Sequence, residues 1–512
     1  MKELRYSNQR GFGLLIILAL LGVFIATAMV TVASGATSNA ARMAETQRAM
    51  AAAKQALVAY AAGVPLAVSA LDCPRADSNG NCARPGDLPC PDLNNDGWSD
   101  GPCFNPLAPV TTKLVGRLPW KTLGLPDLRD GDGERLWYAV SPSFVENPRT
   151  TPCNLPPNTN CLNSNSKGAI TVRDNNAVLV NNGTLQSSAA IAVIIAPGAV
   201  ITRLDKVAPQ DRSCTGDTNV ASCQATNVCS GTGAPVTYTN TALCNPVNYL
   251  DIMQAPVKSV VGAVANKEDN ATFALNATTD GFINGPILDA SGVVRLNDLI
   301  VPVTLADVMV PIQQRVAQEV LGCLRNYAGN AGGTYGNGRY PWAVDASTTF
   351  PTTGYFTDKS GTYFGHVPDS TQLSNTRIDS GSTMSASWPA TCTLGFYNTS
   401  WWMNWKDLVF YGVASDYAPS SSPAPSSCAS AACLTVNPFP TTKQVVVIVA
   451  GPPISGQTRS ANCNTIPAPC NTPSNYLEGT NVTAWSTNAS GSTSTYQGGV
   501  ATTSFDDLAV YQ

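Results

Sequence analysis

The hydrophobic and polar positions give the N-terminal part of the chain two segments of different character. From Phe12 to about Ala33 the residues are almost all apolar. At 1.5 Å per residue, a helix of this length would cross the roughly 30 Å hydrocarbon layer of a bilayer. The residues before it include the basic side chains of Lys2, Arg5 and Arg10. We therefore expect one transmembrane helix with a cytoplasmic N-terminus, and export of the rest of the chain.

The following segment, residues 38–63, is rich in alanine and has the pattern of an amphipathic helix. Met43, Met50 and Leu57 recur at intervals of seven residues, and Tyr60 lies near the same stripe. Charged side chains occupy the opposite positions, as on the solvent face of a helix. Together with the apolar run, this segment predicts a single helix of about 50 residues.

The pattern of apolar and polar residues also repeats later in the chain. The helical segment that ends near Tyr60 is similar to PIQQRVAQEVLGCLRNYAGN, which we expect to form a helix that starts at Pro311. Further segments match in the same order: LPWK with YPWA, RLWYAVS with LVFYGVAS, AVIIAPG with VVIVAGPP, NYLD with NYLEG, and RLNDLIV with SFDDLAV. This colinearity predicts two copies of one fold.

Each copy begins with a helical pattern and continues with short runs of β-branched and aromatic residues between loops rich in Gly, Pro, Asn and Ser. This order predicts an α+β fold, in which a helix packs on an antiparallel sheet. We expect a leader at 1–11, a long N-terminal transmembrane and amphipathic helix at 12–62, a first head at 63–304 and a second head at 305–512. The boundary between the heads precedes the second helix.

Composition favours an exported protein with disulfide-rich loops. The net charge is -4 and only 12% of the residues are charged, which gives no electrostatic signature of nucleic-acid binding. All 16 cysteines lie at or after Cys73, in the part predicted to be exported. The near-neighbour pairs are Cys90 and Cys103, Cys153 and Cys161, Cys223 and Cys229, Cys428 and Cys433, and Cys463 and Cys470. Cys214 and Cys244 could enclose the third pair, but connectivity does not follow from sequence.

The chain has few of the residues on which enzymes depend. His366 is its only histidine, and no nucleophile motif accompanies it. The sequence contains no GxSxG, P-loop, HExxH or CxxC motif. We therefore predict that the protein is not an enzyme. A hydrolase with paired carboxylates stays open as an alternative, because such acids have no fixed spacing.

One acidic loop, LPCPDLNNDGWSDGPC, has the spacing of a calcium site. Its oxygen donors are Asp92, Asn94, Asp96, the main-chain carbonyl of Trp98, and Asp100. These residues occupy the first, third, fifth, seventh and ninth positions of an EF-hand-like loop, an arrangement that Ca²⁺ prefers. The twelfth position is Cys103 instead of the usual glutamate. Ca²⁺ is thus the candidate cofactor, and an ordinary turn rich in Asp and Asn is the alternative.

The N-terminus resembles the class III signal of type IV pilins and pseudopilins, in which a short basic leader ends in Gly11 and Phe12 opens an apolar helix. The resemblance implies cleavage after Gly11 by prepilin peptidase and methylation of Phe12. It also implies a bacterial inner-membrane precursor, held by a single pass, that the pilus machinery assembles into an extracellular filament or a periplasmic pseudopilus. Phe12, Ile16, Leu20 and Phe24 would then self-assemble in the filament core.

Ile16 departs from the pilin pattern. Counted from Phe12 it is the fifth mature residue, where most pilins have a glutamate that pairs with a neighbouring N-terminus. The large minor pseudopilin at the tip of type II secretion pseudopili also lacks this glutamate. The resemblance therefore implies a structural or adhesive filament subunit, with a minor tip pseudopilin as the alternative. From other classes, an anchored exported carboxylate hydrolase and a surface receptor that does not assemble also remain open.

Overall fold

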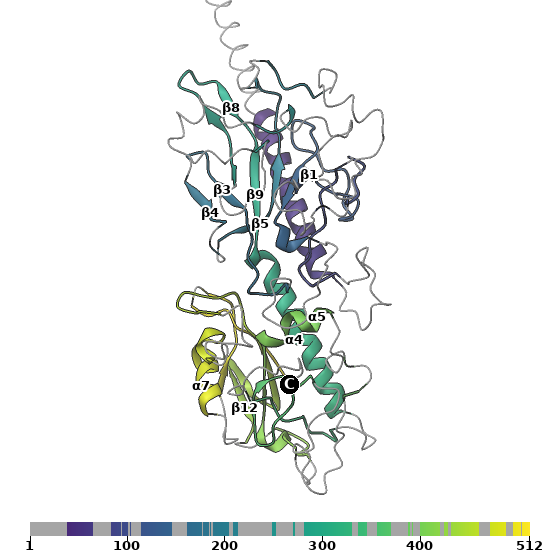
Figure 1. Ribbon diagram of the computed structural model, residues 1–512, viewed down its shortest axis with the longest axis vertical. Coiled ribbons are helices and arrows are strands. Elements are labelled where there is room, and N and C mark those ends of the chain that lie inside the picture. The colour runs from purple at the N-terminus through teal and green to yellow at the C-terminus, as the bar shows by residue number, and fades with distance from the viewer. Residues whose placement is uncertain are drawn as a thin grey trace, which may run out of the picture.

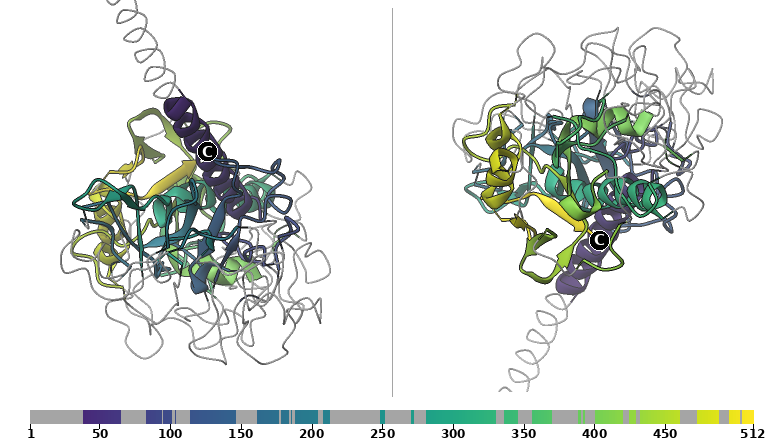
Figure 2. Two further views of the ribbon diagram at one scale, coloured as in Figure 1. Left: turned by 90° about the horizontal axis from the view of Figure 1, so that it is seen from above. Right: turned by 90° about the horizontal axis from the view of Figure 1, so that it is seen from below.

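The structure is a computed structural model, in which two heads of similar architecture follow one another along the chain. In Figure 1 the heads lie one above the other along the long axis, and in the two views along that axis they overlap (Figure 2). The structure describes residues 38–64, 83–93, 95–100, 103, 114–145, 161–176, 178–183, 185, 188–203, 208–212, 248–251, 270–271, 281–329, 336–345, 356–369, 388–389, 392, 400–419, 424–428, 432–459, 472–487, 495–502 and 504–512.

The first described element is a helix at residues 38–62. Ala49, Met50, Ala53 and Leu57 are buried on one face, whereas Met43 is 42% exposed, so the apolar stripe covers only the later turns. Charged side chains occupy the outer face of this helix, which makes it amphipathic.

Among the described residues, no helix is both long enough and apolar enough to cross a membrane. This finding contradicts the predicted fold, which begins with a long transmembrane helix, and the predicted location as a single-pass inner-membrane precursor. The apolar run from Phe12 that led to both predictions lies outside the described residues. The helix at residues 38–62 carries Arg42, Glu45, Arg48 and Lys54, and charged side chains are costly inside a bilayer.

The main sheet of the first head has four antiparallel strands. Their order is β1 (Val115–Arg117), β2 (Trp137–Val140), β5 (Ala190–Ala196) and β9 (Leu299–Thr304). All seven residues of β5 are buried, because side chains cover both faces of this central strand. The buried face of helix 38–62 belongs to the same hydrophobic core as Tyr138 and Ile194 of this sheet.

The second head repeats this sheet with β10 (Phe364–His366), β11 (Val409–Val413), β14 (Val445–Val449) and β16 (Leu508–Tyr511), again antiparallel throughout. The long helix α4 (Leu305–Ala328) follows β9 directly and runs from the first head into the second (Figure 1).

Helix α4 begins six residues before Pro311, where the sequence predicted its start. Thr304 and Asp307 form a capping box at the actual N-terminus, which fixes the first turn. Pro311 lies inside the helix as a result. Buried side chains at Ile312 and Val316 then continue the apolar stripe.

A smaller three-stranded sheet is also present in each head. In the first it contains β4 (Leu179–Asn181), β3 (Thr171–Arg173) and β6 (Gly281–Ile283); in the second it contains β13 (Phe439–Lys443), β12 (Leu434–Asn437) and β15 (Thr495–Gln497). The middle strand pairs antiparallel with one neighbour and parallel with the other in both copies.

Shorter elements complete the described part of the fold. They are η3 (Pro142–Phe144), β7 (Ile287–Leu288), β8 (Val294–Leu296), α5 (Ser400–Trp405), η7 (Lys406–Leu408), η8 (Ser415–Tyr417), η9 (Pro473–Asn475) and α7 (Gly479–Thr487). Helix α5 places Trp401, Trp402 and Trp405 in the core, each at most 1% exposed.

Equivalent hydrogen bonds show which residues of the first copy correspond to which residues of the second. The hydroxyl of Tyr138 on β2 donates to the carbonyl of Pro89 at 3.2 Å, and that of Tyr411 on β11 donates to Pro341 at 2.9 Å. The segment around Pro89 therefore corresponds to YPWA. The predicted match of YPWA with LPWK is wrong, because Trp120 follows β1 whereas YPWA precedes β10.

Direct hydrogen bonds join the two heads. Leu162 donates its main-chain N–H to Asn404 Oδ1 at 2.7 Å, and Asn163 Nδ2 donates to the carbonyl of Asn404 at 2.6 Å. The hydroxyl of Ser164 reaches the carbonyl of Ala450 at 2.9 Å. A loop of the first head thus contacts both α5 and the end of β14.

Candidate functional site

The most distinctive site is a buried polar network that occurs once in each head. It lies at the end of the main sheet, where β5 and β14 end and where β9 and β16 begin. The segments NYLD and NYLE supply one side of the network, and NDL and DDL supply the other. The sequence matched these segments as repeats without indicating that they meet in space.

In the first head, two acids hold each other's main chain. Asp251 Oδ2 accepts the N–H groups of Asn297 at 2.6 Å and of Asp298 at 3.0 Å. Asp298 Oδ2 in turn accepts the N–H of Asp251 at 2.8 Å and Nδ2 of Asn270 at 3.0 Å. We call this reciprocal arrangement the acid clasp. Asp251 and Asp298 are 2% and 0% exposed.

The second head has the same acid clasp with one longer side chain. Glu478 Oε2 accepts the N–H groups of Asp506 and Asp507, each at 3.2 Å. Asp507 Oδ2 accepts the N–H of Glu478 at 3.0 Å and Nδ2 of Asn481 at 2.9 Å. The clasp therefore joins the start of α7 to the segment before β16.

A buried asparagine links each acid clasp to the smaller sheet. Asn270 accepts the N–H of Ile283 at 2.9 Å and donates to its carbonyl at 2.9 Å. Asn481 makes the equivalent pair with Gln497, at 2.8 and 3.1 Å. Each asparagine side chain thus bonds both the N–H and the carbonyl of the last residue of β6 or β15, as the main chain of a paired strand would.

An arginine encloses the network in each head. Arg212 donates to the carbonyl of Gly198 at 2.7 Å and to Gln210 Oε1 at 2.9 Å. Its guanidinium group lies 5.6 Å from the ring centre of Tyr249, and Gln210 Nε2 donates to Asp251 Oδ1 at 3.1 Å.

The second head reproduces these contacts. Arg459 donates to the carbonyl of Gly451 at 2.7 Å and to Gln457 Oε1 at 2.8 Å, and it lies 5.2 Å from the ring centre of Tyr476. Gln457 donates to Glu478, as Gln210 does to Asp251. The two networks therefore agree in donors, acceptors and ring contacts.

Burial dominates the electrostatics of both networks. It raises the pKa of Asp251 to about 7, and burial together with the charge of Asp251 raises the pKa of Asp298 well above its usual range. In the second head, burial and then Glu478 raise the pKa of Asp506 to about 7 and that of Asp507 well above its usual range. Asp251, Asp298 and Asp507 are at most 2% exposed, whereas Asp506 is only partly buried.

The networks differ at the strand that lies beside the tyrosine. Arg117 at the end of β1 lies 4.3 Å from the ring centre of Trp137 and 4.1 Å from that of Tyr249, and burial lowers its pKa to about 10. His366 occupies the equivalent register position on β10. Its ring stacks on Phe356 at 4.9 Å, and burial lowers its pKa to about 4.

The predicted calcium loop has a compact structure of its own. The carboxylate of Asp92 accepts the N–H groups of Asp96 at 3.2 Å and Gly97 at 2.7 Å, and burial raises its pKa to about 6. Asp100 accepts the N–H of Leu93 at 2.6 Å. Asp96 accepts the N–H of Trp98 at 2.8 Å.

Two basic side chains use further oxygens of this loop. Arg135 donates to the carbonyl and to Oδ1 of Asn95, both at 2.8 Å, and Lys121 donates to the carbonyl of Asp96. Asn94 lies outside the described residues. Protein donors thus reach several oxygens of this loop, and calcium binding here stays a prediction.

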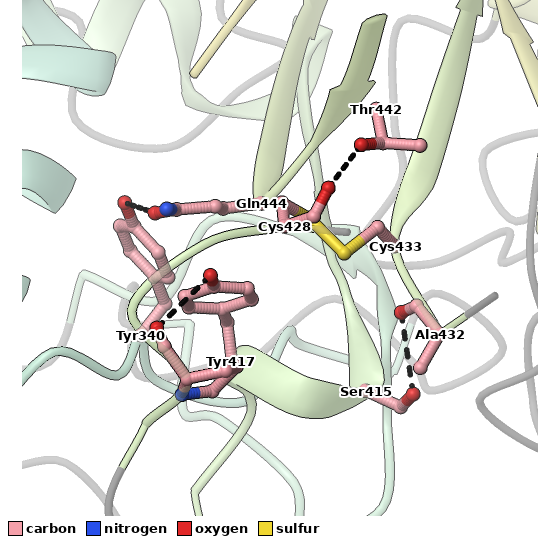
Figure 3. The surroundings of a disulfide bond; sticks show 9 residues. Tyr340, Ser415, Tyr417, Cys428, Ala432, Cys433, Thr442 and Gln444 are labelled. Carbon is pink, nitrogen blue, oxygen red and sulfur yellow. Dashed lines mark hydrogen bonds between the residues drawn. A yellow bond between two sulfur atoms is a disulfide. The ribbon is translucent and has the colours of Figure 1, made fainter. Parts of the chain in front are cut away.

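The structure pairs some of the cysteines that the sequence considered. Disulfides join Cys90 to Cys103 and Cys428 to Cys433. Figure 3 shows the second of these beside Gln444, which accepts the hydroxyl of Tyr340 at 3.1 Å. A third disulfide, which the sequence missed, joins Cys323 and Cys392 across 69 residues. Cys161 is also disulfide-bonded.

The remaining predicted site residues lie outside the described part of the chain. They are Gly11, Phe12, Ile16, Leu20, Phe24, Cys153, Cys214, Cys223, Cys229, Cys244, Cys463 and Cys470. Comparisons with family models, with curated proteins and with solved structures gave no match to this chain. Function therefore has to be argued from the residues and their geometry.

Proposed function

We propose that this chain is a structural subunit of a filament of the type IV pilin kind and that its two heads form the displayed part. The observation that carries the proposal is the arrangement of the first head. An amphipathic helix at residues 38–62 follows the Gly11 and Phe12 junction in sequence and packs against an antiparallel sheet.

The buried polar networks support a structural role. Their acids accept main-chain N–H groups and hold strand ends in place, and Asp298 and Asp507 are at most 2% exposed. A hydrolase needs carboxyl groups that a substrate can reach. The proposal therefore assigns no catalytic role to these residues.

The order of the parts supports display of the second head. The start of helix 38–62 and the second head lie toward opposite ends of the long axis (Figure 1). If the chain from Phe12 supplies the contacts between subunits, the first head lies next to that contact and the second head lies beyond it. Disulfides in both heads suit a protein that works outside the reducing cytosol.

Processing of the N-terminus tests this proposal. Mass spectrometry of the native protein is expected to show a chain that starts at methylated Phe12. Gly11→Val should block cleavage, since the proposed peptidase cuts after this glycine, whereas Gly13→Val should leave cleavage intact. An intact Met1 in the native protein, or equal processing of both variants, would exclude the pilin interpretation.

Assembly is tested separately by electron microscopy. Antibodies against the second head should label sheared filaments along their length. Label at filament ends alone would support the tip pseudopilin alternative, which the isoleucine at Ile16 suggests. Absence of label from every filament would contradict a structural filament role.

A further inference from the structure

A lysine and an aspartate form a buried ion pair in the second head. Nζ of Lys406, the first residue of η7, lies 2.6 Å from Oδ2 of Asp369, and the two side chains are 2% and 1% exposed. Among the lysines that the structure describes, Lys406 is the only one that is buried. Removal of two charges from water is costly, so the pair has to be explained by its surroundings or by its chemistry.

The first head builds the same sheet without this pair. When the register of β10 and β11 is aligned with that of β1 and β2, Trp120 and Gly133 occupy the positions of Asp369 and Lys406. Both members of the pair are therefore absent together from the first copy. The sheet forms without an ion pair at these positions.

Aromatic side chains surround the amine and the carboxyl group. Nζ of Lys406 lies 4.3 Å from the ring centre of Phe356, and Nε1 of Trp402 donates to Asp369 Oδ2 at 2.9 Å. Burial raises the pKa of Asp369, although the charge of Lys406 lowers it. Because burial penalises both charged forms, the neutral amine and the neutral carboxylic acid become accessible here.

The geometry suits attack of the amine on the carboxyl carbon. A nitrogen at hydrogen-bond distance from one carboxyl oxygen lies roughly 3.5 Å from the carboxyl carbon, close to the separation at which bound reactants react. The main-chain N–H of Phe356 donates to Asp369 Oδ1, the other oxygen of the group. This donor would stabilise the negative charge that develops on Oδ1 during the attack. A buried lysine that has lost its proton is a nucleophile toward such a carbon.

We propose that Lys406 and Asp369 join spontaneously in an isopeptide bond, an amide between the two side chains. The bond forms between Nζ and the carboxyl carbon Cγ, and the bond from Cγ to Oδ2 breaks. Oδ2 leaves as water with two of the three protons of the ammonium group, and Oδ1 remains as the amide oxygen. The ion pair thus supplies every atom of the products, and a neutral amide replaces two buried charges.

Such a bond would connect the segment after β10 to the turn before β11, residues that are 37 positions apart in sequence. Cys392 lies within this loop and is joined to Cys323 of α4 by a disulfide. The two cross-links together would tie α4 to the main sheet of the second head. This inference does not depend on the proposed filament role.

Peptide mass spectrometry of the purified full-length protein, after reduction and alkylation of its disulfides and digestion with trypsin, tests the proposal. Arg377 separates the two residues in sequence, and a modified Lys406 resists trypsin. Residues 360–377 and 378–443 should therefore appear as one branched peptide, lighter by one water molecule than the sum of the two linear peptides. Fragmentation should place the branch at Asp369 and Lys406.

Lys406→Arg provides the matched control, because a guanidinium group keeps its charge and does not lose a proton in proteins. The branched peptide should be absent from this variant, and the linear peptide 378–406 should be at least tenfold more abundant than in the wild type. Lys359 pairs with Asp345 in the same head but is 59% exposed. Lys359→Arg should therefore leave the branched peptide intact. Near-ultraviolet circular dichroism verifies that each variant is folded.

Two results would overturn the proposal. One is complete cleavage after Lys406 in the folded wild type, with linear peptides of full mass. The other is loss of water without a branch, which would indicate a succinimide at Asp369 in place of a bond to Lys406. The wild-type digest decides between these outcomes by itself if Lys406→Arg does not fold.

Discussion

At the scale of the residue, the acid clasp shows how a carboxyl group substitutes for sheet hydrogen bonds at a strand end. Asp251 and Asp298 each accept main-chain N–H groups of the segment that carries the other acid. Each segment end is thereby fixed by a side chain that is 47 residues away.

Protonation of His366 should destabilise the second head in acid. Burial lowers the pKa of this histidine from 6.5 to about 4, so the unfolded state binds its proton first as the pH falls. The stability is complete above pH 6.5 and is lost progressively toward pH 4. The contribution of His366 alone is expected to fall by about 2 kcal/mol between pH 7.5 and pH 5, and urea unfolding of the oxidised wild type and of a variant without the histidine measures it as a difference.

His366→Gln provides the comparison, because it removes the titration and keeps a polar side chain. Acidic groups elsewhere titrate equally in both proteins and cancel in the difference. The difference in unfolding free energy between wild type and variant should therefore change with pH. A constant difference from pH 7.5 to pH 5 would show that His366 is not the responsible group.

At the scale of the element, the junction between β9 and α4 needs no linker. Thr304 is the last residue of β9 and also the N-cap of α4. The carboxylate of Asp307 accepts the main-chain N–H of Thr304 at 2.7 Å and its hydroxyl at 2.8 Å. Lys54 of the first helix pairs with the same carboxylate at 2.9 Å.

Removal of this cap should destabilise the start of α4. Asp307→Ala is expected to lower the unfolding free energy by about 1 kcal/mol, in the range of lost helix caps. Asp307→Asn keeps an acceptor for Thr304 but loses the charge that faces Lys54, and this partly exposed pair contributes less. Urea unfolding should rank wild type, Asn and Ala in decreasing stability. Equal stability of the Ala variant and the wild type would contradict the capping role.

Local patterns predicted the elements better than the contacts between them. The strands around Trp137 and Phe410 were matched from sequence because their residues are contiguous, and β2 and β11 occupy equivalent places in the sheets. The start of α4 was misplaced because Pro311 is a strong local signal, whereas the capping residues precede it. The clasps were missed because acids such as Glu478 and Asp507 are 29 residues apart in sequence, and only the pairing of the strands brings them together.

At the scale of the whole molecule, hydrogen bonds between individual side chains and main-chain groups join the two heads. Asn404 is 2% exposed, and its Oδ1 accepts the N–H of Leu162 from the other head. A buried N–H without an acceptor costs roughly 1–3 kcal/mol. The contact between the heads therefore depends on the side chain of Asn404, in the short helix α5 that precedes β11.

Asn404→Ala should loosen this contact without unfolding the heads. Hydrogen exchange at the amide of Leu162 is expected to accelerate at least tenfold, whereas amides of β5 should exchange at the wild-type rate. Asn404→Asp retains an oxygen acceptor and should preserve the slow exchange. Unchanged exchange at Leu162 in the Ala variant would show that other contacts hold this loop.

The direct passage from β9 into α4 also decides how the chain would carry a load. A pull on the second head is transmitted along α4 to Thr304 and then into β9, whose six residues pair with β5 along the strand direction. Their hydrogen bonds would bear that force together, in shear, and would not open one after another. If the chain has the proposed filament role, the first head would therefore resist extension under a load applied through the second head.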